Sequence, residues 1–216
     1  MNTAVSGTAQ AAKQTQWQLD PAHSAAHFSV RHLMISNVRG DFNKVSGSAV
    51  LDMSDPTKSA IEVNVDITSI DTREPQRDDH LRSADFFDVE HHPKVTFSGR
   101  FVERTGDTSF KGSADLTIRA VTRAVPLDVS YLGEWRTPFW AGDENRGELR
   151  RIGFEALARV NRHDFGVSWQ DELPGEGVVV GNEIQLFLDA EAILLDDLRR
   201  TGAIEYYAED VDRFAV

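Results

Sequence analysis

The sequence predicts an all-β fold, either a barrel or a sandwich. Between residues 27 and 192, apolar side chains alternate with polar ones through most of the chain, the pattern of strands with one buried face. These runs follow one another without a regular helical pattern between them. Such a series favours an antiparallel barrel or sandwich over a fold that alternates strands and helices.

The strand pattern begins after residues 1–16, which show no periodicity and are expected to form a disordered tail. Short strands are predicted at 27–31, 61–68, 95–101 and 125–131, and strands of ten or more residues at 39–51, 108–119, 149–160 and 178–192. Ten residues at about 3.3 Å each, tilted by about 40°, would give a barrel roughly 25 Å tall.

Small residues recur on the predicted inward face and would leave room inside such a barrel: Ala26, Ala49, Ala114, Ala156, Ala158 and Ala190. A barrel of about eight strands is wide enough to hold one small ligand. The alternative is that large and small side chains interdigitate and fill the interior. The alternation alone does not decide between an open and a filled barrel.

A charged block from Thr72 to Phe97 interrupts the strands, with a short helical connection predicted near residues 77–87. It is far longer than a strand-to-strand turn needs, and long connections usually carry function. It would lie at the barrel mouth, as a lid or a head-group site. Arg77, Asp78 and His80 are candidates to orient a phosphate or other polar head group. Alternatively, Asp78 caps the helix and Arg77 ties the block to the barrel rim.

Two further segments leave alternatives open. Arg162, in the stretch Asn161–Gly166, either reaches the barrel mouth as a head-group ligand or acts as a structural tether. Residues 194–216 break the alternation and predict an appended helix or a pairing arm with an acidic face. This extension would pack outside the barrel or join a partner subunit, or it would be a frayed tail.

Composition excludes several classes of function. A formal charge of −12 argues against binding along nucleic-acid phosphates, and it also disfavours docking on anionic lipid surfaces. The absence of cysteine removes disulfides, thiolate zinc sites and a cysteine nucleophile. No apolar run reaches the ~18 residues of a membrane span, so no integral membrane segment is expected. The N-terminal residues lack the basic and apolar regions of a secretory signal, which predicts a cytoplasmic protein.

Neither a metal nor a catalytic centre is predicted. His23 and His27 are four residues apart, which on a strand places them about 13 Å apart, too far to bind one ion. His23 is expected instead to order the corner after Asp20 and Pro21. Ser24 adjoins His23, but neighbours on a strand face opposite sides. No nucleophile elbow or phosphate loop is present, so we expect a non-enzyme without cofactors.

An ordered set of motifs nevertheless resembles one family. The set comprises Trp17-x-Leu19-Asp20-Pro21-x-His23-Ser24, Phe28-Ser29-Val30-Arg31-His32, Arg77-Asp78-x-His80-Leu81-Arg82, Asp85-Phe86-Phe87-Asp88-Val89, Leu116-Thr117-Ile118-Arg119 and Asn161-Arg162-x-x-Phe165-Gly166. Together, over residues 17–193, they resemble the YceI-like family of polyisoprenoid-binding, lipocalin-like β-barrels. Residues 136–148 and the extension after 193 match nothing in that family.

The resemblance implies an extended antiparallel barrel of about eight strands with an apolar tunnel for a long-chain lipid. It also implies a homodimer. Relatives are often periplasmic, but the missing signal keeps that assignment from carrying over. Relatives commonly have glycine where Ala120 stands, which puts a left-handed backbone there in doubt.

We therefore predict a protein that binds, sequesters or transports a long-chain amphiphile such as a polyisoprenoid, a quinone or a fatty acid or amide. The alternatives are an enzyme acting on an apolar substrate and a stress-related structural dimer with a filled core. The residues predicted to line the ligand site are Phe28, Val30, Phe42, Val63, Val65, Ile67, Phe97, Leu116, Ile118 and Phe154, with Trp169 near one end.

Overall fold

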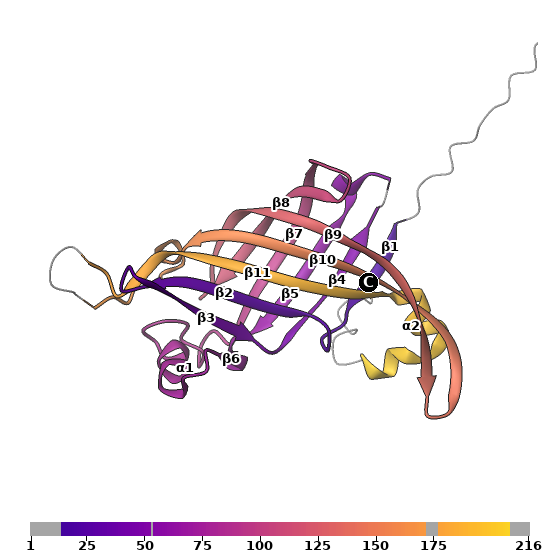
Figure 1. Ribbon diagram of the computed structural model, residues 1–216, viewed down its shortest axis with the longest axis horizontal. Coiled ribbons are helices and arrows are strands. Elements are labelled where there is room, and N and C mark those ends of the chain that lie inside the picture. Colours follow the sequence, from indigo (N-terminus) through magenta and orange to yellow (C-terminus); the bar gives the residue numbers. More distant parts are fainter. Residues whose placement is uncertain (1–13, 53, 172–176, 208–216) are drawn as a thin grey trace, which may run out of the picture.

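Eight strands close into an antiparallel barrel in the computed structural model, which describes residues 14–52, 54–171 and 177–207 (Figure 1). Around the ring lie β1 (Thr15–Leu19), β4 (Val45–Leu51), β5 (Ala60–Asp66), β7 (Lys94–Arg104), β8 (Ser109–Ile118), β9 (Val121–Ala141), β10 (Glu144–Asn161) and β11 (Val180–Leu194). Pairing of β11 with β1 closes the ring. The predicted eight-stranded barrel is therefore confirmed.

Three more strands lengthen the ring at one end: β2 (Ala25–His32), β3 (Ser36–Phe42) and β6 (Ile70–Asp71). Both β1 and β2 pair with β11, so they form one strand bent at residues 20–24. β3 and β4 follow one another along the chain but are separate strands, with a break at Asn43 and Lys44. The prediction of a continuous strand over 39–51 was wrong, because the backbone nitrogens of Asn43 and Lys44 bond to Ser69 instead of to a strand partner.

Helical turns fill the connections. They are η1 (Pro56–Lys58), η2 (Ile67–Ser69), α1 (Pro75–Arg82), η3 (Arg162–Phe165), α2 (Leu195–Thr201) and η4 (Ala203–Tyr206). The helix predicted near 77–87 begins and ends earlier, as α1. Glu74 caps α1 by accepting from the backbone nitrogens of Gln76 and Arg77, and Pro75 suits the first helical position. Asp78, predicted as a possible cap, is not the capping residue.

The chain ends differ from the predicted boundaries where they are described. Thr15 and Gln16 belong to β1, so the barrel begins two residues before its predicted start at residue 17. Residues 1–13 lie outside the described residues, as do 208–216. The part of the extension that is described folds as α2 and η4. No helix within the described ranges is long and apolar enough to cross a membrane.

The helix α2 packs against the outside of the barrel. Leu198 and Ala203 are fully buried against Leu149 of β10 and Ile193 of β11. Ile193 points outward because its neighbour Ala192 packs in the barrel core. Without α2, the apolar surface of Ile193 would be exposed to water, which would cost roughly 25 cal/mol of folding free energy per Å². The helix therefore completes this end of the wall.

At that same end, β9 and β10 extend past the barrel as a two-stranded arm, residues 131–150. β9 pairs with β8 only up to Ser130, and β10 pairs with β11 only from Arg151 onward. Figure 1 shows the arm curling beside α2, away from α1. Residues 136–148, which sequence reasoning could not map onto the resembled family, belong to this arm.

Candidate functional site

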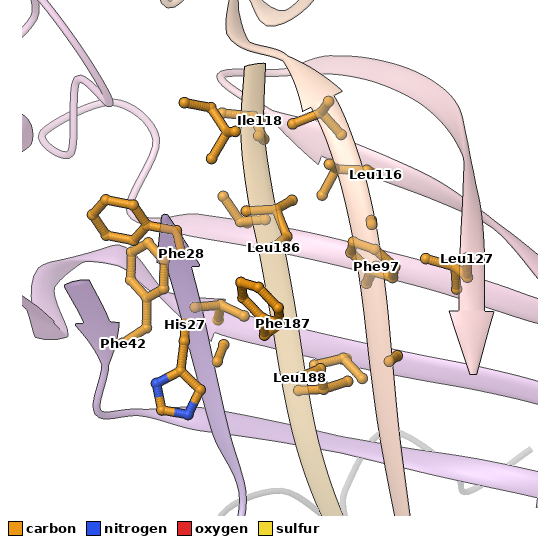
Figure 2. Close-up of a pocket in the computed structure, with 18 of the residues that line it drawn as sticks. His27, Phe28, Phe42, Phe97, Leu116, Ile118, Leu127, Leu186, Phe187 and Leu188 are labelled. Atoms are coloured by element: carbon orange, nitrogen blue, oxygen red, sulfur yellow. The ribbon is translucent and has the colours of Figure 1, made fainter. Parts of the chain in front are cut away.

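The barrel encloses an apolar cavity of about 210 Å³ (Figure 2). Among the described residues that line it, only His27, Arg100 and Arg162 are polar, and all others are apolar or glycine. Both ring nitrogens of His27 lie close to carboxylates on neighbouring strands. Nδ1 is 2.8 Å from Asp41 Oδ1, and Nε2 is 3.2 Å from Asp189 Oδ2. A water molecule needs two to four polar partners, so a cavity with such walls favours apolar contents.

Small side chains create this space. Ala26, Ala156, Ala158 and Ala190 lie on the cavity wall, as expected, and Gly99 adds a further gap. The other two predicted small residues, Ala49 and Ala114, do not line it. Larger residues in place of these alanines would fill the interior at the density that protein cores normally reach. The structure thus resolves the question that alternation left open: the barrel is hollow in its middle.

Ten of the eleven residues predicted to line the ligand site do surround the cavity. They are Phe28, Val30, Phe42, Val63, Val65, Ile67, Phe97, Leu116, Ile118 and Phe154. Trp169 is not among the lining residues, and it packs behind Phe86 with ring centroids 5.3 Å apart. Whether these walls contact a ligand stays a prediction.

A gap in the barrel wall is covered by residues 72–93, which we call the lid. β3 pairs with β6 only at Asp41 and Phe42, so in the described chain residues 36–40 have a partner strand on one side only. The lid fills this side, and its apolar residues Leu81, Phe86 and Phe87 reach the cavity. α1 contacts β6, and Figure 1 shows α1 at the same end of the barrel as β6.

Two arginines hold the lid to the barrel through backbone oxygens. Arg82 donates from its η2 nitrogen to Ile70 O at 2.8 Å and from Nε to Thr68 O at 3.2 Å. Arg119, in the β8–β9 turn, donates from one nitrogen to Phe86 O at 3.0 Å and to Gly166 O at 3.1 Å. Arg119 and Ala120 have φ angles of +50° and +62°, so the left-handed turn is kept although Ala120 replaces glycine.

Arg77 and Asp78 form a bonded unit inside the lid and do not line the cavity. Asp78 Oδ1 accepts from the backbone nitrogen of Thr72 at 2.9 Å and from its hydroxyl at 2.5 Å. Arg77 donates to Thr72 Oγ1 and to Thr72 O, each at 2.7 Å. These contacts hold the start of the lid to α1, so they lie within the lid and do not join Arg77 to the barrel rim. Both side chains already form hydrogen bonds to Thr72, whereas a head-group ligand would need their polar atoms free.

His80 lies in an aromatic cluster at the lid end. Its ring is 5.0 Å from that of Phe86 and 4.9 Å from that of Trp169, both edge-on. Its Nε2 lies 2.9 Å from Asp85 Oδ2. The cluster packs behind Phe86, which is the most buried of the lid residues that line the cavity. His80 is therefore one layer behind the cavity wall, as Trp169 is.

Arg162 is the one predicted rim residue that lines the cavity. It is 4% exposed and donates to four backbone oxygens, those of Val167, Trp169, Val180 and Gly181, at 2.8 to 3.2 Å. Within the described chain it forms no ion pair, and burial lowers the pKa of its guanidinium. These hydrogen bonds favour the tether alternative for Arg162.

Aromatic rings separate the cavity from a smaller pocket at the opposite end. Phe101 stacks with Phe110 at 5.2 Å and with Phe154 at 6.1 Å, and Phe154 lies 5.3 Å from Tyr131. The pocket beyond them measures about 130 Å³, and its lining includes Asp52, Arg104, Asp107 and Tyr131. The two ends of the barrel interior therefore differ in chemistry.

The corner between β1 and β2 carries an ion-pair network that sequence analysis foresaw only in part. Asp20, 1% exposed, accepts from Arg151 at 2.6 Å and lies 3.0 Å from His23 Nδ1, so His23 orders the corner as expected. Arg151 also pairs with Glu191. Asp20, His23 and Glu191 each place one ligand atom within 4.8 Å of the others. The Arg151 guanidinium already supplies the positive charge there.

Several residues of the site were missed by sequence reasoning. Ile184, Leu186 and Leu188 of β11 line the cavity, and their alternation was the available signal. Phe165 closes the lid end at 1% exposure, but no periodic pattern marks it because it lies in η3. Arg82 and Arg119 bond to carbonyls, which leave no trace in a sequence.

The geometry can hold an apolar chain, and it offers little for polar chemistry. A cavity of ~150 Å³ with apolar walls is known to stay dry and take up benzene, and this one is larger. The uncompensated Arg162 lies at one end, and the aromatic barrier lies at the other. Such a site distinguishes ligands by length and bulk, since few wall atoms can form hydrogen bonds.

The model of the YceI-like domain matches residues 17–192. The chain is 32% identical to a UPF0312 protein of Azotobacter vinelandii over 171 residues, covering 79% of this chain and 82% of that protein. It is 33% identical to Protein YceI of Escherichia coli O157:H7 over 145 residues, covering 67% of this chain and 71% of the other.

Solved structures agree with the fold. The YCEI protein of Campylobacter jejuni superposes with a TM-score of 0.59 at 27% identity, covering 76% of this chain and 88% of that one. BcnA of Burkholderia cenocepacia gives 0.64 at 20% identity over 80% and 98% of the two chains. A polyisoprenoid-binding domain from Saccharophagus degradans gives 0.56 at 13% identity over 82% and 98%.

Proposed function

Because this chain belongs to the YceI-like domain family, we propose that it binds a long-chain amphiphilic lipid in the barrel cavity. The cavity itself carries the proposal: about 210 Å³ of space with nearly all-apolar walls. One solved neighbour is described as a polyisoprenoid-binding domain, which supports a lipid as the cargo. Polyisoprenoids, quinones and fatty acids or amides are the proposed ligand classes.

Arg162 sets the orientation of the ligand in this proposal. Its donors already bond to backbone oxygens, so this buried guanidinium, which has no carboxylate partner in the described chain, would attract an anionic group by its charge. The acyl or prenyl tail would extend from there toward the rings of Phe101 and Phe154. Arg77, Asp78 and His80 then act on the lid, and they do not contact the head group.

Extraction of the purified protein tests the proposal. Native mass spectrometry followed by organic extraction is expected to release a long-chain amphiphile. Ala156→Phe, which places a ring in the cavity, should abolish the bound mass while leaving the barrel folded. Ala114→Phe is unsuitable as a control because Ala114 is fully buried, whereas Ala124→Phe on the exposed face of β9 should keep the ligand. An empty protein whose melting temperature no prenyl or acyl chain raises would contradict lipid binding.

Catalysis on an apolar substrate is the alternative function. It would appear as a product that forms with the wild-type protein and disappears when His80 or Arg162 is replaced. The observed contacts favour binding, because His80 stands behind the wall and Arg162 donates to backbone oxygens. A filled-core structural dimer, the other alternative, fits poorly with the open cavity.

We further propose that the chain forms a homodimer through the arm. Leu132, Trp135 and Trp140 are 61%, 75% and 56% exposed, which is unusual for large apolar residues in one segment. Beyond Tyr131, β9 also has no strand partner opposite β10 within the described ranges. A second copy would cover both the exposed rings and this edge.

A further inference from the structure

The turn between β2 and β3 exposes three successive large apolar residues. Leu33, Met34 and Ile35 are 36%, 59% and 81% exposed. Scattered apolar residues on a surface are ordinary, but three in a row at a hairpin tip form a projecting apolar point. In Figure 1 this tip lies at the lid end of the barrel, far from α2 and the arm.

The backbone conformation of this turn makes leucine and methionine unusual residues at positions 33 and 34. Leu33 and Met34 have φ angles of +49° and +63°, and the nitrogen of Ile35 donates to His32 O at 3.1 Å. This is the geometry of a type I′ turn, which Asn-Gly adopts with little strain and bulky L-residues adopt unfavourably. Leucine and methionine are therefore not explained by the needs of the fold. Such strain often marks a functional segment.

Positive charge flanks the tip in a chain that is strongly acidic overall. From Arg31 to Gly40 there is no acidic residue, although the whole chain carries −12. Arg31 and Arg39 are exposed, and neither forms an ion pair or a side-chain hydrogen bond within the described chain. The closest acidic residues along the paired strands are Asp41 and Glu183, and Asp41 is already paired with His27.

We infer that the tip of Leu33, Met34 and Ile35 inserts into the interface of an anionic bilayer, with Arg31 and Arg39 contacting lipid phosphates. The apolar side chains match the acyl boundary, and the free guanidiniums match the phosphates. This revises the expectation drawn from net charge, since charge averaged over the chain hides the basic tip. The inference deepens the proposed lipid binding, because it places the lid end, where cargo would enter, against the membrane.

Vesicle co-sedimentation tests the inference. The full chain is expected to sediment with vesicles that contain phosphatidylglycerol and much less with pure phosphatidylcholine, and high salt should weaken the binding. Arg31→Gln and Arg39→Gln should each weaken it by about fivefold. Arg199→Gln, an exposed arginine on α2 at the other end, should leave it unchanged.

A double variant separates docking from folding. Leu33→Asn with Met34→Gly gives the turn the residues that its backbone favours, so the barrel should be at least as stable as wild type. The same variant should lose vesicle binding. Tyr206→Ser removes a 69% exposed aromatic ring at the opposite end and should keep it.

The outcomes are distinct. Failure of the wild-type chain to sediment with anionic vesicles would overturn the inference. Undiminished binding by the Asn-Gly variant would overturn it equally. Neither result depends on cargo, since vesicle binding is scored whether or not extraction finds a lipid. An empty barrel that still docks would defeat the proposed function alone.

Discussion

At the scale of single residues, Asp20 makes the clearest pH-dependent contribution. Burial alone would raise its pKa, but hydrogen bonds from His23 and Arg151 outweigh burial and lower it. A lowered folded-state pKa means that the charged form stabilises the fold above the unfolded value of about 4, and that this stability is lost as pH falls through the folded pKa. The corner should therefore loosen in acid.

Asp20→Asn should lower the free energy of unfolding by roughly 2 kcal/mol at neutral pH, because Arg151 loses a charged acceptor but keeps Glu191. Urea unfolding at several pH values measures this. The variant should also lose less stability than wild type between pH ~5 and pH ~2. Asp196→Asn, at an exposed position on α2, provides the matched control. Parallel pH curves for Asp20→Asn and wild type would refute the role assigned to Asp20.

At the scale of elements, the lid depends on a few bonds to backbone oxygens and should open independently of the barrel. Arg119→Gln removes the donor to Phe86 O and Gly166 O, each worth roughly 1 to 2 kcal/mol. Hydrogen exchange should then speed up in residues 80–92, with β7 to β11 unchanged. Arg123→Gln, whose side chain bonds only to Thr122 O next to it in the described structure, is the control. Equal exchange in both variants would show that Arg119 does not hold the lid.

At the scale of the whole molecule, the arm predicts the assembly state. Light scattering should give twice the 24.1 kDa chain mass. Removing two exposed rings, Trp135→Ser with Trp140→Ser, should raise the dimer dissociation constant by roughly a thousandfold, since two tryptophans buried in an interface at ~2 kcal/mol each contribute about 4 kcal/mol. Ile35→Ser, at an 81% exposed position away from the arm, should not change the mass. A wild-type monomer at high concentration would rule out the proposed dimer.

Sequence reasoning reached the barrel and most of its cavity wall because both follow from local periodicity. Every second residue of a strand faces inward, so Phe28, Val63 and Leu116 could be placed from alternation alone. Periodicity says nothing about contacts between distant segments. Asp20 and Arg151 are 131 residues apart, and nothing in either neighbourhood marks the other.

The same limit explains the remaining errors. The break at Asn43 in the predicted strand 39–51 depends on Ser69, far along the chain. The roles of Arg77 and Arg82 depend on backbone oxygens, which every residue has. The arm could not be predicted because the place where β9 and β10 leave the barrel depends on where β8 ends. In each case the local structure depends on a tertiary contact that the neighbouring sequence does not reveal.

The closure of the ring by β1 and β11 has a consequence for the order of folding. Trp17 pairs with Leu194, so the first described strand must wait for nearly the whole chain before it finds its second neighbour. Contacts so distant in sequence form late, because loop closure must precede them. During synthesis the sheet remains an open trough. If the proposed amphiphile is present then, it would be enclosed as β1 pairs with β11, whereas one that arrives afterwards would have to pass the lid.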